Sequence, residues 1–144
     1  MANYLDVKNR IQSVSTTLGY NLIVTDKYEV NNQSDNFEIG KIYMLDDVGG
    51  MTTEDKMTNG YYIVNGFNKS IWFVKDIAKD DNQNDKDTTY NDLITAINTF
   101  IHKFNEGGGK TNYISSWRTT RGQITNNYFL AVNLSCRITT ECNR

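Results

Sequence analysis

The strongest constraint on the fold is a strict alternation of apolar and polar residues near the end of the chain. Between Tyr128 and Ile138, apolar side chains occupy every second position, and from Asn133 to Glu141 polar side chains fill the positions between and beyond them. Such alternation predicts a long strand with one buried and one wet face, which is typical of an antiparallel sheet. An apolar sheet face has to be covered by another layer.

Two segments carry the helical spacing that this cover requires. In Tyr4–Leu18, apolar residues recur every three or four positions, and Gly19 follows where a left-handed C-cap is expected. Residues Tyr90–Phe104 carry a wider apolar stripe, with Thr88 or Thr89 as the expected N-cap. We expect both helices to pack on the apolar face of the terminal strand.

The first half of the chain predicts further strands. Asn21–Val30 contains a short apolar run, and Phe37–Leu45 has apolar residues at both parities, which indicates a strand covered on both faces. Asp46–Gly60 reads as a long loop that becomes ordered against a partner. Tyr61–Ile77 is rich in strand-forming residues and predicts either a hairpin that turns at Asn65-Gly66 or one long bulged strand.

The second half predicts a polar loop and a hairpin. Lys79–Asp87 is polar throughout, and we expect a solvated loop there. Thr111–Trp117 and Gln123–Cys142 form the two arms of the hairpin, with Arg118–Gly122 as a basic tip that is either a solvated turn or a contact loop. With 144 residues, we expect a single α+β domain over residues 1–144, built as a two-layer sandwich with a mostly antiparallel sheet.

Few residues suit catalysis or cofactor binding, and we predict no enzyme and no cofactor. His102 is the single histidine and falls opposite the apolar stripe of its helix. Cys136 and Cys142 lie six residues apart on one strand, too far to form a disulfide with each other, so we expect free thiols. No zinc or phosphate-binding motif occurs, and a net charge of −2 argues against a protein that coats nucleic acid.

Membrane and secretion signals are not visible in the sequence. No apolar run approaches the length of about 18 residues that a membrane-spanning helix needs. The first ten residues contain no basic stretch that leads into an apolar segment. We therefore expect neither a membrane partner nor a secretory signal.

The order of elements resembles that of the tail terminator and neck (tail-completion) proteins of tailed bacteriophages. The resemblance covers most of the chain and is topological. It follows the opening helix, the segments KIYMLDD and YYIVNGFNKSIWFVKD, the helix NDLITAINTFIHKF and the closing segment SSWRTTRGQITNNYFLAVNLSCRIT. The absence of proline is also common in phage structural proteins that AT-rich genes encode.

This resemblance implies a virion structural protein that is made in the host cytoplasm. It would form a homo-oligomeric, hexameric ring at the head-proximal end of the tail tube and contact the tube and the neck proteins. DNA would pass through the lumen without specific binding. The resemblance places Asp46, Asp47, Glu54 and Asp55 near the lumen or the tube contact, and the further candidate interface residues are Trp72, Trp117, Arg118 and Arg121.

Two other functions remain open from the sequence. The first is a small inhibitor or binding module that acts on one protein partner through the aromatic segment Tyr61–Trp72. The second is a small metal-dependent nuclease that uses carboxylates near strand ends, namely Asp26, Glu29, Asp46 and Asp47. Assembly state and metal dependence distinguish the three functions.

Overall fold

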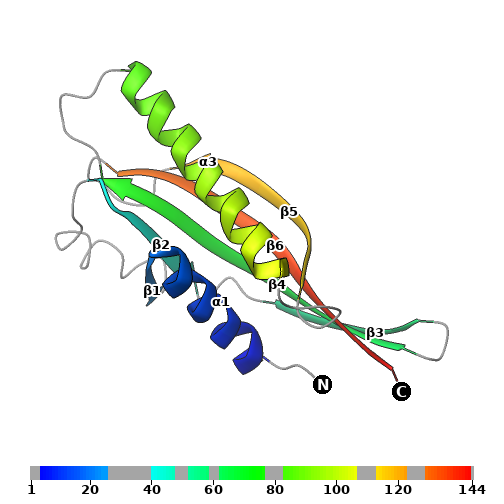
Figure 1. The fold of residues 1–144 in the computed structure, drawn as a ribbon. Helices are drawn as coiled ribbons and strands as arrows, with labels where there is room; N and C mark the ends of the chain where they lie inside the picture. Colours follow the sequence, from blue (N-terminus) through cyan, green and yellow to red (C-terminus); the bar gives the residue numbers. More distant parts are fainter. Residues whose placement is uncertain are drawn as a thin grey trace.

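The computed structural model describes residues 4–25, 40–47, 52–58, 62–76, 83–106, 113–122 and 129–143, and the elements below lie within them (Figure 1). In chain order they are α1 Tyr4–Leu18, β1 Asn21–Thr25, β2 Ile42–Asp47, β3 Thr52–Thr58, β4 Tyr62–Asp76, α3 Gln83–Glu106, β5 Tyr113–Gly122 and β6 Phe129–Asn143.

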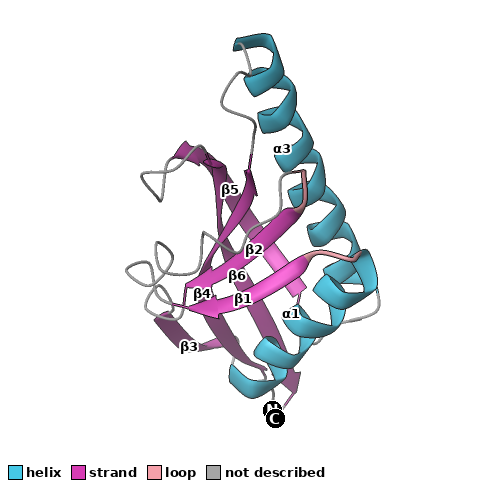
Figure 2. Ribbon diagram, turned by 90° about the vertical axis from the view of Figure 1, so that its left-hand side faces the viewer, coloured by secondary structure: helices cyan, strands magenta, loops and turns pink. Residues whose placement is uncertain are grey.

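The strands form one sheet with the order β1-β2-β4-β6-β5, and β3 pairs with the first half of β4. The β1–β2 pair is parallel, and the other four pairings are antiparallel. Both helices lie on one side of this sheet (Figure 2). The protein therefore has the α+β fold with a mostly antiparallel sheet that the sequence predicts.

The main core lies between the helices and the sheet. Phe73 of β4 makes an edge contact with Phe100 of α3, with ring centroids 5.8 Å apart. The buried face predicted for β6 is confirmed, because Val132, Leu134, Cys136 and Ile138 all join this core. The opposite face is less wet than predicted, since Asn133 and Thr139 are buried there. On the opposite face of the sheet, Tyr43, Leu45, Val74 and Ala131 form a second, smaller buried cluster. Strand β2 is thus buried on both faces, as its apolar residues at both parities predict.

The two helices are also fixed to each other. Gly19 has a φ of 76°, and the amides of Gly19 and Tyr20 donate to the carbonyls of Thr16 and Ser15. This is the predicted left-handed C-cap of α1, in the Schellman arrangement. Arg10 of α1 donates to two carbonyls in the last turn of α3, at 2.9 and 3.2 Å, where helix carbonyls lack partners within the helix.

Two predictions for the first half of the chain are wrong. The predicted strand Phe37–Leu45 does not include Gly40, which lies in a turn with a φ of 88°, and β2 starts only at Ile42. The predicted loop Asp46–Gly60 instead contains the end of β2 and the whole of β3. Residues 26–39 lie outside the described residues, so the end of the predicted strand Asn21–Val30 is not described.

Three further predictions, from Tyr61 onward, need correction. Of the two alternatives for Tyr61–Ile77, the hairpin turn at Asn65-Gly66 is wrong and the single long strand is confirmed, because β4 runs from Tyr62 to Asp76 and pairs with β6 along its whole length, although without the predicted bulge. Helix α3 starts at Gln83, inside the predicted polar loop, so Thr88 and Thr89 do not cap it. The predicted tip Arg118–Gly122 is not a turn either but the second half of β5.

Part of the sheet extends beyond the helices. Strand β3, the start of β4 and the end of β6 project past α1 and α3 as a three-stranded extension, which we call the arm (Figure 1). In the arm, Thr52–Thr58 pairs with Tyr62–Asn68, and the same part of β4 pairs with Arg137–Asn143. Seven paired residues correspond to roughly 24 Å of strand.

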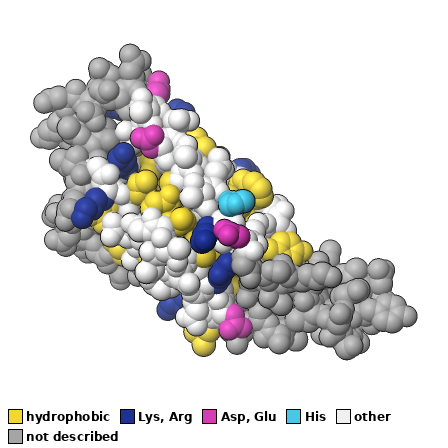
Figure 3. Space-filling model, in the orientation of Figure 1, with side chains coloured by type: hydrophobic (Ala, Val, Ile, Leu, Met, Phe, Trp, Pro, Cys, Tyr) yellow, Lys and Arg dark blue, Asp and Glu magenta, His cyan; other side chains and the backbone are white. Residues whose placement is uncertain are grey.

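Within the described residues, neither helix has the length and apolar character required to cross a membrane. On the helix-bearing face, basic and acidic side chains are interspersed and do not gather into a patch of one sign (Figure 3).

Candidate interaction surface

Strand β5 is an edge of the sheet, because among the described strands it pairs only with β6. Residues Ser115 to Arg121 are exposed, and half of the Trp117 surface is accessible. An edge strand presents unpaired backbone N–H and C=O groups, which can pair with another chain. Near its start β5 has a register shift between Ile114 and Ser116, so the regular part of the edge is residues 116–122.

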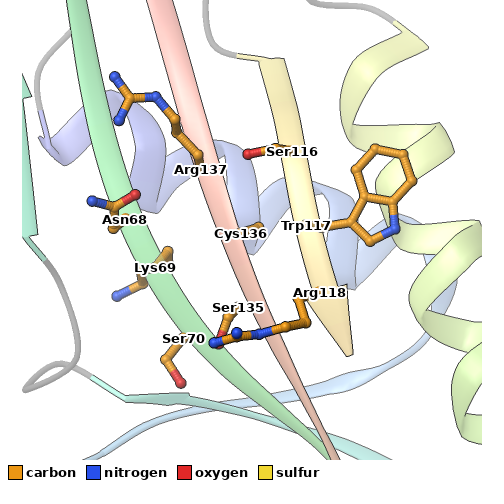
Figure 4. A pocket seen from close by; sticks show the side chains of 9 residues that line it. All are labelled: Asn68, Lys69, Ser70, Ser116, Trp117, Arg118, Ser135, Cys136 and Arg137. Carbon is orange, nitrogen blue, oxygen red and sulfur yellow. The ribbon is translucent and has the colours of Figure 1, made fainter. Parts of the chain in front are cut away.

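An open groove of about 450 Å³ lies on the sheet face that points away from the helices. The register brings its side chains into two rows across the sheet. The first row contains Arg118, Ser135 and Ser70, and the second contains Ser116, Arg137 and Asn68. Figure 4 shows that the Arg118 side chain reaches across β6 towards β4, whereas Trp117 points to the opposite side.

Hydrogen bonds order the polar residues around this groove. Asn133 donates to the Ser70 hydroxyl at 2.8 Å, and the Ser135 hydroxyl donates to the side-chain oxygen of Asn133 at 2.8 Å. The short side chains of these serines leave the space that the groove occupies. Arg118 and Arg137 also line the groove, and polar groups held in this way form a preorganised surface for hydrogen bonds to a partner.

A buried ion pair lies on the other, helix-bearing side of the sheet. Asp46 and Lys69 are 1% and 0% exposed, and their charged atoms are 2.5 Å apart. Asp46 ends the part of β2 that pairs with β4, and Lys69 follows the part of β4 that pairs with β3. The ion pair therefore sits where the arm joins the rest of the sheet. The Asp46 carboxylate is buried in the protein interior, so it is not exposed to the lumen of the ring that the resemblance implies.

Four of the other predicted interface residues lie on β2, β3 and β4. Asp47 is the last residue of β2, and Glu54 and Asp55 lie in β3 within the arm; their side chains are outside the described residues. Trp72 is partly buried, and its indole lies so close to Gly122 of β5 that a Cβ there would be 2.9 Å from the ring.

Arg121 differs from Arg118 because it has contacts within the chain. Its guanidinium lies over the Tyr90 ring, 4.5 Å from the ring centroid, and its nearest nitrogen is 3.9 Å from an Asp87 carboxylate oxygen. Arg121 thus connects the end of β5 to α3. Among the described residues, Arg118 is the β5 arginine whose charge faces the groove and the open edge.

Among the described residues, the side chains suited to catalysis or metal binding do not form a cluster. Cys136 is a free, buried thiol, as predicted, and burial raises its pKa to about 12. His102 is exposed on α3, as predicted. Within the part of the chain that the structure describes, no three His, Cys, Asp or Glu side chains lie close enough together to hold a metal ion. Asp26 and Glu29 lie outside that part.

Sequence reasoning missed Lys69 and Arg137. Lys69 has the same parity as Phe67 and Ile71, so treating β4 as one strand would have placed a lysine on the buried face. The alternation in β6 predicts Arg137 on the polar face of that strand. It does not predict the groove, because the groove also needs Ser70 and Ser116, which lie far from Arg137 in the sequence. The pairing of β4, β6 and β5 brings these residues together.

No protein-family model matches the chain, and no curated protein is significantly similar to it. The functional argument therefore rests on the residues and on the geometry described above.

Proposed function

We propose that this chain is a structural subunit that assembles with copies of itself into a ring. The observation that carries the proposal is the open edge of β5, with its regular strand of exposed residues and its half-exposed Trp117. In a monomer, a long open edge favours unwanted pairing, and natural proteins usually block or cover it. Pairing with a neighbouring subunit covers the edge and satisfies its backbone groups.

Within this class, the role we propose is that of a tail terminator-like protein of a tailed bacteriophage. The α+β fold, with its opening helix, long antiparallel strands and second helix, supports this role because it is the arrangement that the resemblance implies. In this role the ring would end the tail tube, join it to the neck in the virion, and let DNA pass. The tube and neck proteins would be its partners.

Native mass spectrometry over a wide concentration range tests the proposal. We expect a species of about six times the 16.5 kDa chain mass, and ring-shaped particles in micrographs of the same sample. A clean dimer at all concentrations would contradict a ring, because a dimer closes through a two-fold interface and leaves nothing to propagate.

The groove favours a second candidate function, a module that binds one protein partner. Arg118 and Arg137, together with hydrogen-bonded serines and Asn133, could recognise a polar segment of that partner. A monomer that forms a one-to-one complex, and whose binding is lost in Arg118→Ala, would support this function over the ring.

A further inference from the structure

The outer part of the arm extends past the two helices, whereas Phe67 and Ile138 at its base belong to the core beneath them (Figure 1). The arm part of β4 includes the apolar residues Tyr62, Ile63 and Val64. Short ribbons of two or three strands have little stability in water unless one face packs against something. A further strand paired to its open edge would therefore add to the stability of the arm.

Strand β3 is a second open edge. Among the described strands it pairs only with β4, so its outer side has unpaired backbone groups like those of β5. The two edges lie on opposite sides of the β4–β6 pair, because β3 joins β4 and β5 joins β6. One subunit thus offers two different strand edges that face away from each other.

The charges of these two edges are complementary. Strand β5 carries Arg118 and Arg121 and no acidic residue. Strand β3 carries Glu54 and Asp55 next to a single basic residue, Lys56. Opposite charges across an interface fix its register and disfavour the pairing of like edges. A β5–β5 contact would bring arginines together, whereas a β3–β5 contact brings carboxylates to arginines.

From these three observations we propose that β3 of one subunit adds to the β5 edge of the next subunit and continues the sheet across the interface. Because the two edges differ, the contact is head-to-tail and can close into a ring. The proposal rests on the proposed assembly into a ring and identifies the two surfaces that join. It also makes the arm part of a wider sheet that continues into the neighbouring subunit.

Charge reversal on each edge, followed by mixing, tests this pairing. The variant Arg118→Glu reverses the β5 charge that faces the open edge, while Arg121 stays bound to Tyr90 and Asp87, and the double variant E54K/D55K reverses the β3 edge. Each one alone brings like charges together, so we expect at least about tenfold weaker assembly in native mass spectrometry. An equimolar mixture should regain even-numbered rings in which the two variants alternate, because every contact then joins opposite charges.

The control is Lys8→Glu, an equal charge reversal at an exposed position of α1, which should assemble like the wild type. Circular dichroism confirms that each variant folds. If E54K/D55K does not fold, the neutral E54Q/D55N replaces it, with weaker assembly expected. The proposed pairing is overturned if the wild type forms rings while both reversed variants do so equally well, or if mixing restores nothing. A wild type that never assembles would instead overturn the proposed function itself.

Discussion

The buried ion pair between Asp46 and Lys69 makes a strong prediction about stability. Both side chains are essentially inaccessible to water and lie among apolar core residues, with Ile71 opposite Asp46 and Cys136 opposite Lys69 in the strand register. Replacing Lys69 by Met removes the positive charge and keeps most of the chain length. Asp46 then keeps its carboxylate in the interior, where a charge without its partner is costly.

The magnitude follows from this burial. Removing one member of a fully buried ion pair costs about 3–5 kcal/mol, whereas replacing both members by apolar residues is often neutral or stabilising. We therefore expect Lys69→Met and Asp46→Leu each to lower the free energy of unfolding by about 3 kcal/mol. The double variant should recover most of that loss, which corresponds to a coupling free energy of more than about 4 kcal/mol.

Urea unfolding followed by circular dichroism measures these values, with the slope of the transition checked for each variant. An unchanged slope shows that the loss is one of stability and not of denatured-state compactness. The reasoning is refuted if each single variant loses less than about 1 kcal/mol, the range of exposed ion pairs, or if the two losses simply add.

Two further predictions concern the side chains of Asn105 and Cys136. Asn105→Ala should lower the free energy of unfolding by about 1–2 kcal/mol in urea, because Asn105 accepts from the Ile114 amide and donates to its carbonyl. For Cys136, burial raises the thiol pKa from 9.0 to about 12 in the folded protein. Its contribution to stability is therefore intact below pH 9 and is lost between pH 9 and pH 12, by up to about 1.4 kcal/mol per pH unit. Cys136→Ala should lose less stability than the wild type between pH 8.5 and pH 10.5; equal losses would contradict this assignment.

The elements that the sequence predicts correctly are those with a buried stripe. Helix α1, the central part of α3 and strand β6 each bury one face. Burial of one face leaves apolar residues at regular spacing in the sequence, so these elements can be predicted. Strand β3, with the sequence TTEDKMT, has no such pattern. It is an edge strand held by pairing with β4, and charged residues are tolerated on edges, so its composition resembles that of a loop.

The other errors have similar physical reasons. Asn65-Gly66 is a strong local turn signal, but continuous pairing of β4 with β6 on one side, and with β3 on the other, overrides it. Helix α3 starts early because its first turns need no apolar stripe, and Asp85 and Asp87 there favour a helix N-terminus through its dipole. The groove and the ion pair arise from cross-strand register, which a single sequence does not encode in any local pattern.

Amide hydrogen exchange on β5 tests most directly whether the open edge is an assembly surface. We expect the outward amides between Ser116 and Gly122 to exchange at least tenfold more slowly in the assembled protein than in dilute monomer, while those of Arg118→Glu stay fast. Equal exchange of β5 in both states, with new protection on another surface of the assembled protein, would contradict the account.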